Sequence, residues 1–130
     1  MSFPDLTDAA LCRAHYATMM ALASDPHADL MEQCEYLRAM AHRIDAGELL
    51  AERYPELLKI VFSDLAQTSH DWARRHEPDP NRMVELAKQA LRFCRRSESI
   101  PGTYIRPELL ARIQNLLRQL GVSGEELELA

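Results

Sequence analysis

The chain has 130 residues, of which 47% are hydrophobic and 27% are charged, and its formal net charge is −5. This length and composition indicate one globular domain and exclude a largely disordered chain. No run of about 18 apolar residues occurs, which excludes a membrane-spanning helix.

Apolar residues recur at spacings of three and four through most of the chain, a pattern that predicts helices and no strands. The first two helices are predicted over residues 5–23 and 28–46. Asp5 or Thr7 is expected to cap the first one, because short polar side chains accept hydrogen bonds from the first free N–H groups of a helix. Gly47 is expected to end the second in a left-handed conformation.

A short helix is then expected over residues 48–53. A long helix is predicted over 55–75, opened by a proline that needs no N–H partner in the first turn. Two more helices are predicted over 81–97 and 107–120, each with a regular apolar face.

Short connections between helices of this length are typical of an antiparallel bundle. We therefore predict an all-α fold, an antiparallel bundle of about five helices, that forms one helical domain over residues 1–122. A short acidic C-terminal tail is expected over 123–130, where Ser123 and Glu126 have the spacing of a capping pattern.

The expected compartment is the cytoplasm. The N-terminus has neither the basic region nor the apolar region of a secretory leader. The three cysteines, Cys12, Cys34 and Cys94, form no C-x-x-C pair, so we expect free thiols packed in apolar surroundings rather than disulfides.

Charge is unevenly distributed along the chain. Residues 1–65 carry 5 basic and 11 acidic side chains, whereas residues 82–118 carry 8 basic and 3 acidic ones. An acidic N-terminal half favours a basic protein partner and argues against nucleic acid as the main ligand.

Acidic residues of the N-terminal half recur on one side of the second helix and around the start of the next one. We interpret them as a docking surface whose field attracts a basic partner, with exposed tyrosines as anchors. The alternative is an ordinary solvated face. Tyr54 and Tyr104 are further candidate anchors. The predicted partner-binding residues are Asp29, Glu32, Glu35, Tyr36, Asp45, Glu48 and Glu52.

Two segments carry a resemblance to a known family. Gln33-Cys34-Glu35-Tyr36-Leu37-Arg38, and the helix start Glu77-Pro78-Asp79-Pro80, resemble segments of small helical immunity proteins paired with type VI secretion toxins of bacteria, notably NAD-degrading effectors. The chain departs from the family at Arg74-Arg75-His76, where acidic residues are usual. The resemblance implies a non-catalytic protein that blocks the active cleft of a toxin.

Enzymatic chemistry has little support in the sequence. No glycine-rich phosphate loop, nucleophile–base pair or set of three closely spaced metal ligands occurs, so no catalytic residue, metal or cofactor is predicted. One pattern opposes this view, because His42 and the His70-Asp71 doublet resemble the ligands of HD-type metal phosphohydrolases. That chemistry needs a distant closing aspartate, and only Asp79 follows.

Two further interpretations stay open beside the leading one, an immunity or antitoxin-type inhibitor of a basic toxin. Lys88, Arg92 and Arg96 share a face of the fourth helix, and would contact phosphates in a nucleic-acid-binding regulator or match the acidic half within the molecule. The leucines of 109–120 form an apolar stripe that would seal a homodimer in a helical adaptor or secretion chaperone.

Overall fold

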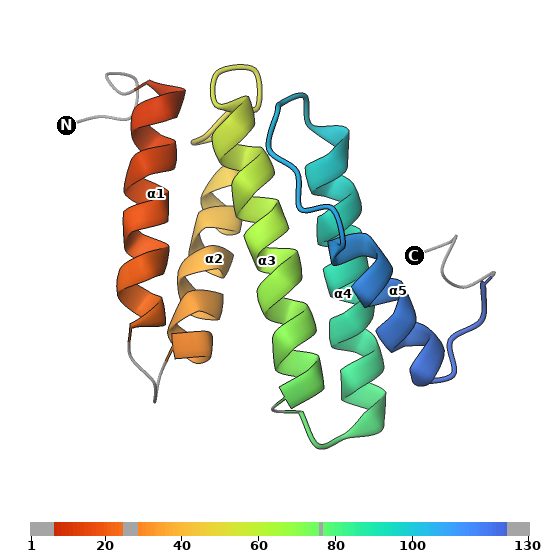
Figure 1. The fold of residues 1–130 in the computed structure, drawn as a ribbon. Helices are drawn as coiled ribbons and strands as arrows, with labels where there is room; N and C mark the ends of the chain where they lie inside the picture. The colour runs from red at the N-terminus through yellow and green to blue at the C-terminus, as the bar shows by residue number, and fades with distance from the viewer. Residues whose placement is uncertain (1–6, 25–28, 76, 125–130) are drawn as a thin grey trace.

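The computed structural model describes residues 7–24, 29–75 and 77–124. Within them five helices follow one another: α1 (Asp8–Ala23), α2 (Asp29–Asp45), α3 (Pro55–Arg75), α4 (Pro80–Ser99) and α5 (Leu109–Gln119). No strand occurs in this described part, so the all-α prediction is confirmed. Successive helices run in opposite directions, as in an antiparallel bundle (Figure 1).

α3 is the central element of the bundle. It contacts all four other helices, with α1 and α2 on one side and α4 and α5 on the other (Figure 1). One hydrophobic cluster joins α1 and α2 to the first half of α3 around Leu37 and Phe62. A second joins the rest of α3 to α4 and α5 around Leu91 and Leu117. The two edge helices, α1 and α5, therefore pack into different clusters.

Local sequence places most helix ends where they were predicted. Thr7 Oγ1 accepts a hydrogen bond from the N–H of Ala10 at 3.1 Å and is the N-cap of α1. Pro55 is the first residue of α3. Gly47 and Gly121 follow α2 and α5 with φ angles of 82° and 88°, a left-handed conformation that glycine adopts without steric cost.

Other expectations about the elements are corrected by the structure. The segment 48–53 forms turns rather than a short helix, and Leu49 within it is buried in the core. A segment this short gains too few hydrogen bonds to offset helix nucleation. α5 begins at Leu109 rather than at Pro107. Of the predicted acidic tail, residues 125–130 lie outside the described residues.

The leucine-rich face of 109–120 lies inside the molecule. Leu109, Ile113 and Leu117 pack into the cluster formed with α3 and α4. The exposed residues of α5 are Ala111, Arg112, Asn115, Arg118 and Gln119. These leucines are therefore not available to seal a homodimer, which corrects that expectation. None of the described helices combines the length and the apolar character needed to cross a membrane.

Candidate functional site

α1 rests on the bundle with few buried apolar side chains. Of its 16 residues, Leu11 and His15 are buried. Its exposed residues, which we call the α1 face, are Ala9, Arg13, Ala14, Tyr16, Ala17, Met20, Ala21 and Ala23. A surface helix of a globular protein normally turns charged and polar side chains to this side. The α1 face instead has a single charged residue, Arg13.

Asp8 attaches the start of α1 to the start of α3. Its two carboxylate oxygens accept hydrogen bonds from the N–H groups of Glu56 and Leu57, each at 3.0 Å. The first N–H groups of a helix have no partner in their own helix, and the positive end of the helix dipole favours a carboxylate. Asp8 therefore caps α3 from a position 48 residues earlier in the chain.

His15 joins α1 to α3 and α2 in the interior. Its Nε2 lies 2.8 Å from Asp64 Oδ2, and its Nδ1 lies 2.8 Å from the hydroxyl of Tyr36. The imidazole also stacks on the Tyr36 ring, with 5.4 Å between the ring centroids. Because an ionised carboxylate only accepts hydrogen bonds, Nε2 donates to Asp64. Both ring nitrogens are thus engaged, and neither is free to act on a substrate.

Arg106 completes this network from the segment between α4 and α5. One amino group donates to Asp64 Oδ1 at 2.7 Å, and the other donates to the carbonyl of Ser63 at 3.0 Å. His15 and Arg106 thereby occupy one oxygen each of a carboxylate whose side chain is only 10% exposed. Asp64 is thus paired with a cation and hydrogen-bonded through both oxygens, as the burial of a charged group requires.

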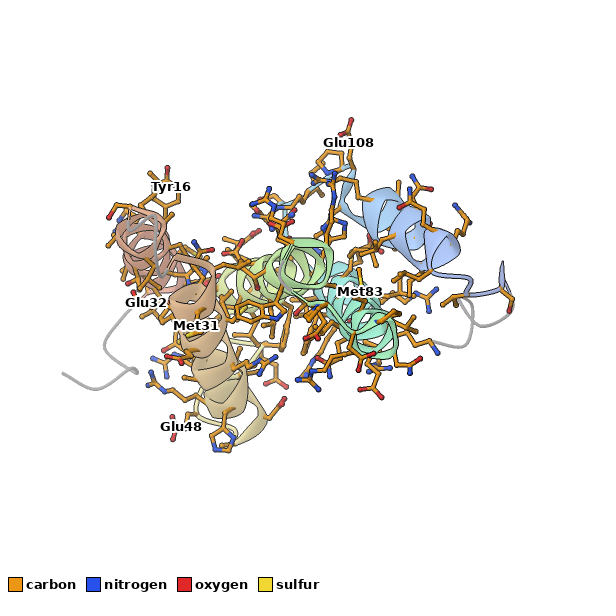
Figure 2. All side chains as sticks on the ribbon, turned by 90° about the horizontal axis from the view of Figure 1, so that it is seen from below. Tyr16, Met31, Glu32, Glu48, Met83 and Glu108 are labelled. Atoms are coloured by element: carbon orange, nitrogen blue, oxygen red, sulfur yellow. The ribbon has the colours of Figure 1, made fainter. Side chains whose placement is uncertain are left out.

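A groove of about 330 Å³ lies over the network. α1 lines it with Tyr16, Met19 and neighbouring side chains, α3 with Ile60 and Asp64, and the segment before α5 with Tyr104 and Arg106. Seen along the helices, Tyr16 and Glu108 project on either side of α3 (Figure 2). The groove is mostly apolar and open to solvent, and its α1 side is continuous with the α1 face.

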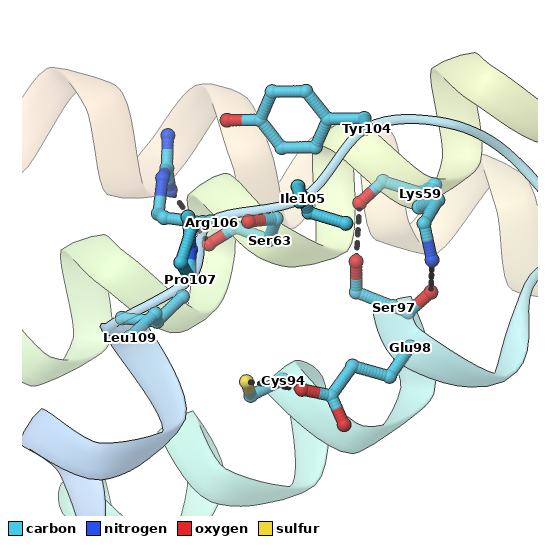
Figure 3. A pocket seen from close by; sticks show the side chains of 10 residues that line it. All are labelled: Lys59, Ser63, Cys94, Ser97, Glu98, Tyr104, Ile105, Arg106, Pro107 and Leu109. Atoms are coloured by element: carbon cyan, nitrogen blue, oxygen red, sulfur yellow. Dashed lines mark hydrogen bonds between the residues drawn. The ribbon is translucent and has the colours of Figure 1, made fainter.

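A second cavity, of about 230 Å³, lies beneath the segment 100–108 (Figure 3). The buried Lys59 donates there to the carbonyls of Ser97 and Ile100, at 2.8 Å and 3.0 Å. These carbonyls belong to the negative end of α4, where an ammonium group is stabilised. Burial also raises the pKa of the Cys94 thiol, to about 11, so it is protonated and unreactive at neutral pH. The polar groups that line this cavity therefore stabilise the fold.

Glu56 fastens the same segment to α3. Its carboxylate accepts hydrogen bonds from the N–H and the hydroxyl of Thr103 and from the N–H of Tyr104. The hydrogen bonds from Thr103 in particular hold the pKa of Glu56 below its ordinary value. A Cβ atom on Gly102 would lie 2.9 Å from this carboxylate, so a glycine leaves the space that the contact needs.

The described residues bring no metal site together, because no group of three or more His, Cys, Asp or Glu side chains among them could hold an ion. His42 is exposed on α2, and Asp79 caps α4. His70 Nδ1 lies 3.1 Å from Asp71 Oδ1, which also accepts from Gln67. Burial would raise the pKa of Asp71, but these two hydrogen bonds, together with the charges of His70 and Arg75, outweigh it and hold the pKa below its ordinary value. The phosphohydrolase pattern is not assembled in this part of the chain.

The predicted acidic residues do not form one free surface. Asp45 pairs with Arg96 of α4 at 2.6 Å, and Glu48 pairs with Arg43 at 2.9 Å. The side chain of Asp29 lies outside the described residues. The predicted acidic residues that are described are all exposed: Glu32, Glu35, Asp45, Glu48 and Glu52.

The basic face of α4 is partly matched within the molecule. Besides its pairing with Asp45, the guanidinium of Arg96 lies 4.1 Å from the centroid of the Phe62 ring. A cation over an aromatic ring is attracted by the negative face of that ring. This supports the intramolecular alternative for Arg96, one of the three residues that suggested a phosphate-binding helix.

The expected exposure of Tyr36 and Tyr54 is not observed. Tyr54 is buried, and Tyr36 is half-buried against His15, so neither is an exposed anchor. The exposed tyrosine is Tyr16, at 67%. It was missed because apolar residues lie on every side of α1, so periodicity did not show which side faces solvent.

Comparison of the chain with protein-family models, with curated proteins and with solved structures found no match. The geometry of the molecule therefore carries the functional argument. Two features stand out in it, namely the α1 face and the groove beside it.

Proposed function

We propose that this chain is a non-catalytic protein-binding domain that binds a basic protein through its N-terminal half. The observation that carries the proposal is the α1 face, which has one charged residue among eight exposed ones. Contiguous exposed apolar residues on a small domain are typical of interaction sites. The contact of these apolar side chains with water is unfavourable, and a partner that covers the α1 face removes it.

The groove supplies anchoring positions beside the α1 face. Tyr16 and Met20 are 67% and 56% exposed at its edge, and Met19 lies deeper. Tyrosine is enriched among residues that dominate binding energy, and methionine adapts its shape to varied partners. We expect apolar side chains of the partner to enter the groove over Ile60.

Glu32 supplies the charge that selects a basic partner. It is exposed on α2, near α1 (Figure 2). No ion pair engages its carboxylate within the described part of the chain. An acidic side chain at the rim of an apolar surface speeds association with a basic partner and makes it sensitive to salt.

We infer that the partner is a toxin and that binding blocks it, as in an immunity or antitoxin-type inhibitor. The resemblance of segments 33–38 and 77–80 to immunity proteins of type VI secretion toxins supports this. The engaged state of His15 and Asp64 supports a binding role over catalysis. The free thiols of all three cysteines suit the cytoplasm, where we place the complex.

The test is capture of the partner from native lysate, followed by affinity measurement with the purified pair. We expect Met20→Glu to weaken binding more than tenfold, and Glu32→Lys to weaken it severalfold at low salt and less at high salt. Glu85→Lys makes the same charge change at an exposed residue of α4, a helix that does not contact α1 or line the groove, and serves as the matched control. Equal affinity of wild type, Met20→Glu and Glu32→Lys would overturn the proposal.

A further inference from the structure

We propose that, without its partner, the α1 face is covered by a second copy of this chain through a two-fold symmetric pairing of the α1 helices. This goes beyond the proposed function, because the occupant is the chain itself. It rests on the proposed function in one respect, namely that the partner and the second copy use the same face.

The pairing of charges depends on which residues of α1 and α2 lie at the same level along the helices. These helices are antiparallel neighbours, and the contact between His15 and Tyr36 places these two residues at about the same level. Counting along the helices in opposite directions places Glu32 level with Met19. Met19 lies three residues after Tyr16, and Arg13 lies three residues before it. Each is therefore about 4.5 Å from Tyr16 along the helix axis, at 1.5 Å per residue.

These levels make the charges of Arg13 and Glu32 complementary to those of a second copy. A two-fold axis at the level of Tyr16 makes the two α1 helices antiparallel and brings Arg13 of one copy level with Glu32 of the other. An interface of this symmetry repeats each contact, so it contains two such ion pairs. Both side chains are exposed, and no ion pair engages either of them within the described residues.

An apolar surface lies between the two pairs of charges. Tyr16 lies at the axis, where it meets its symmetry mate, and ring pairs of this kind are favourable beyond the area they bury. The other uncharged members of the α1 face are five alanines and Met20, and small side chains let two helices approach closely. A single pair of helices buries less surface than a standard stable interface. The dimer is therefore weak, and a tighter partner displaces it.

The test is sedimentation velocity of the full chain from micromolar to submillimolar concentration. Wild type is expected to form a dimer as concentration rises. Arg13→Glu and Glu32→Arg each replace two attractions by two repulsions, and each is expected to raise the dissociation constant of the dimer about tenfold. The double variant Arg13→Glu with Glu32→Arg restores opposite charges and is expected to recover wild-type association.

Arg118→Glu, on the exposed side of α5, is the matched control for charge reversal and is expected to dimerise as wild type does. All the substituted residues are exposed, so each variant is expected to fold, which circular dichroism verifies. A wild type that stays monomeric, or a double variant no better than the single ones, would overturn the inference. Because no other protein is present, that failure leaves the proposed partner binding standing, and failure to bind a partner does not affect this result.

Discussion

The two edge helices of the bundle, α1 and α5, are attached to it in opposite ways. α5 buries four of its 11 residues, all leucine or isoleucine, and exposes polar or small side chains. α1 buries two of its 16 residues, and its attachment relies on the polar contacts of Asp8 and His15. α5 therefore completes the core, whereas the outer face of α1 takes no part in the packing of the fold. That face is the one that we propose for binding.

The largest expected effect on stability comes from weakening the packing of α5 in the core. Leu117 is fully buried, and Leu117→Ala is expected to lower the free energy of unfolding by about 3 kcal/mol, through lost transfer energy and a cavity. Met20→Ala on α1 is the matched control and is expected to change it by less than about 0.5 kcal/mol. Urea denaturation measures both. Similar losses in the two variants would contradict the contrast between the edge helices.

The next effect tests the polar attachment of α1. Asp64→Ala removes the partner of both His15 and Arg106 and is expected to cost about 2 kcal/mol, because it leaves buried donors unpaired. Asp45→Ala removes an ion pair with Arg96 in which both side chains are about half exposed. Its expected cost is below about 0.5 kcal/mol, since solvent screens such pairs. Chemical denaturation of the two variants distinguishes a network that holds α1 from an incidental contact.

A smaller effect concerns the cap that α1 supplies to α3. Asp8→Ala is expected to cost about 1 kcal/mol, as the loss of an N-cap does. The amide protons of Glu56 and Leu57 are then expected to exchange faster with solvent, because they lose their acceptors. Asp8→Asn keeps one oxygen acceptor and is expected to lose less stability. Unchanged exchange at both amides in Asp8→Ala would show that the cap is not formed.

The smallest expected effect on stability concerns the protonation of Glu56, which holds the segment before α5. The folded-state pKa of Glu56 lies below its ordinary value of 4.5, so the ionised carboxylate stabilises the fold above about pH 4.5. This contribution is lost as the pH falls through the folded-state pKa. Glu56→Gln is expected to reduce the loss of stability in that range. Denaturation series at several pH values measure it, and parallel curves for wild type and variant would contradict the role of Glu56.

The helices themselves could be predicted from the sequence, because each depends on local information. Leucine spacing predicted α5, and Gly47 predicted the end of α2. Burial depends on neighbouring helices, however, and the burial of side chains on α5 was predicted wrongly. The leucines of 109–120 look like surplus apolar surface, yet α5 packs on both α3 and α4, which buries Leu109, Leu116 and Leu117 and partly buries the other two.

The groove beside the α1 face could not be predicted, because the residues that line it and the network beneath it meet only in the fold. His15 and Asp64 are 49 residues apart, and Asp64 and Arg106 are 42 apart. No local pattern links residues at such separations. The acidic character of the N-terminal half was visible in the sequence, but its pairing was not, as the contact between Asp45 and Arg96 illustrates.

Oxidation of methionines by dilute peroxide, read by mass spectrometry, tests directly whether the α1 face is a binding face. Met20 on α1 and Met31 on α2 are 56% and 55% exposed, and Met31 lines a different groove, with Glu35 and Arg38. Solvent access governs the rate at which a methionine is oxidised to its sulfoxide. We expect Met20 to become protected as protein concentration rises, or when the partner is added, while Met31 does not. Oxidation of both at the same rates under every condition would contradict this expectation.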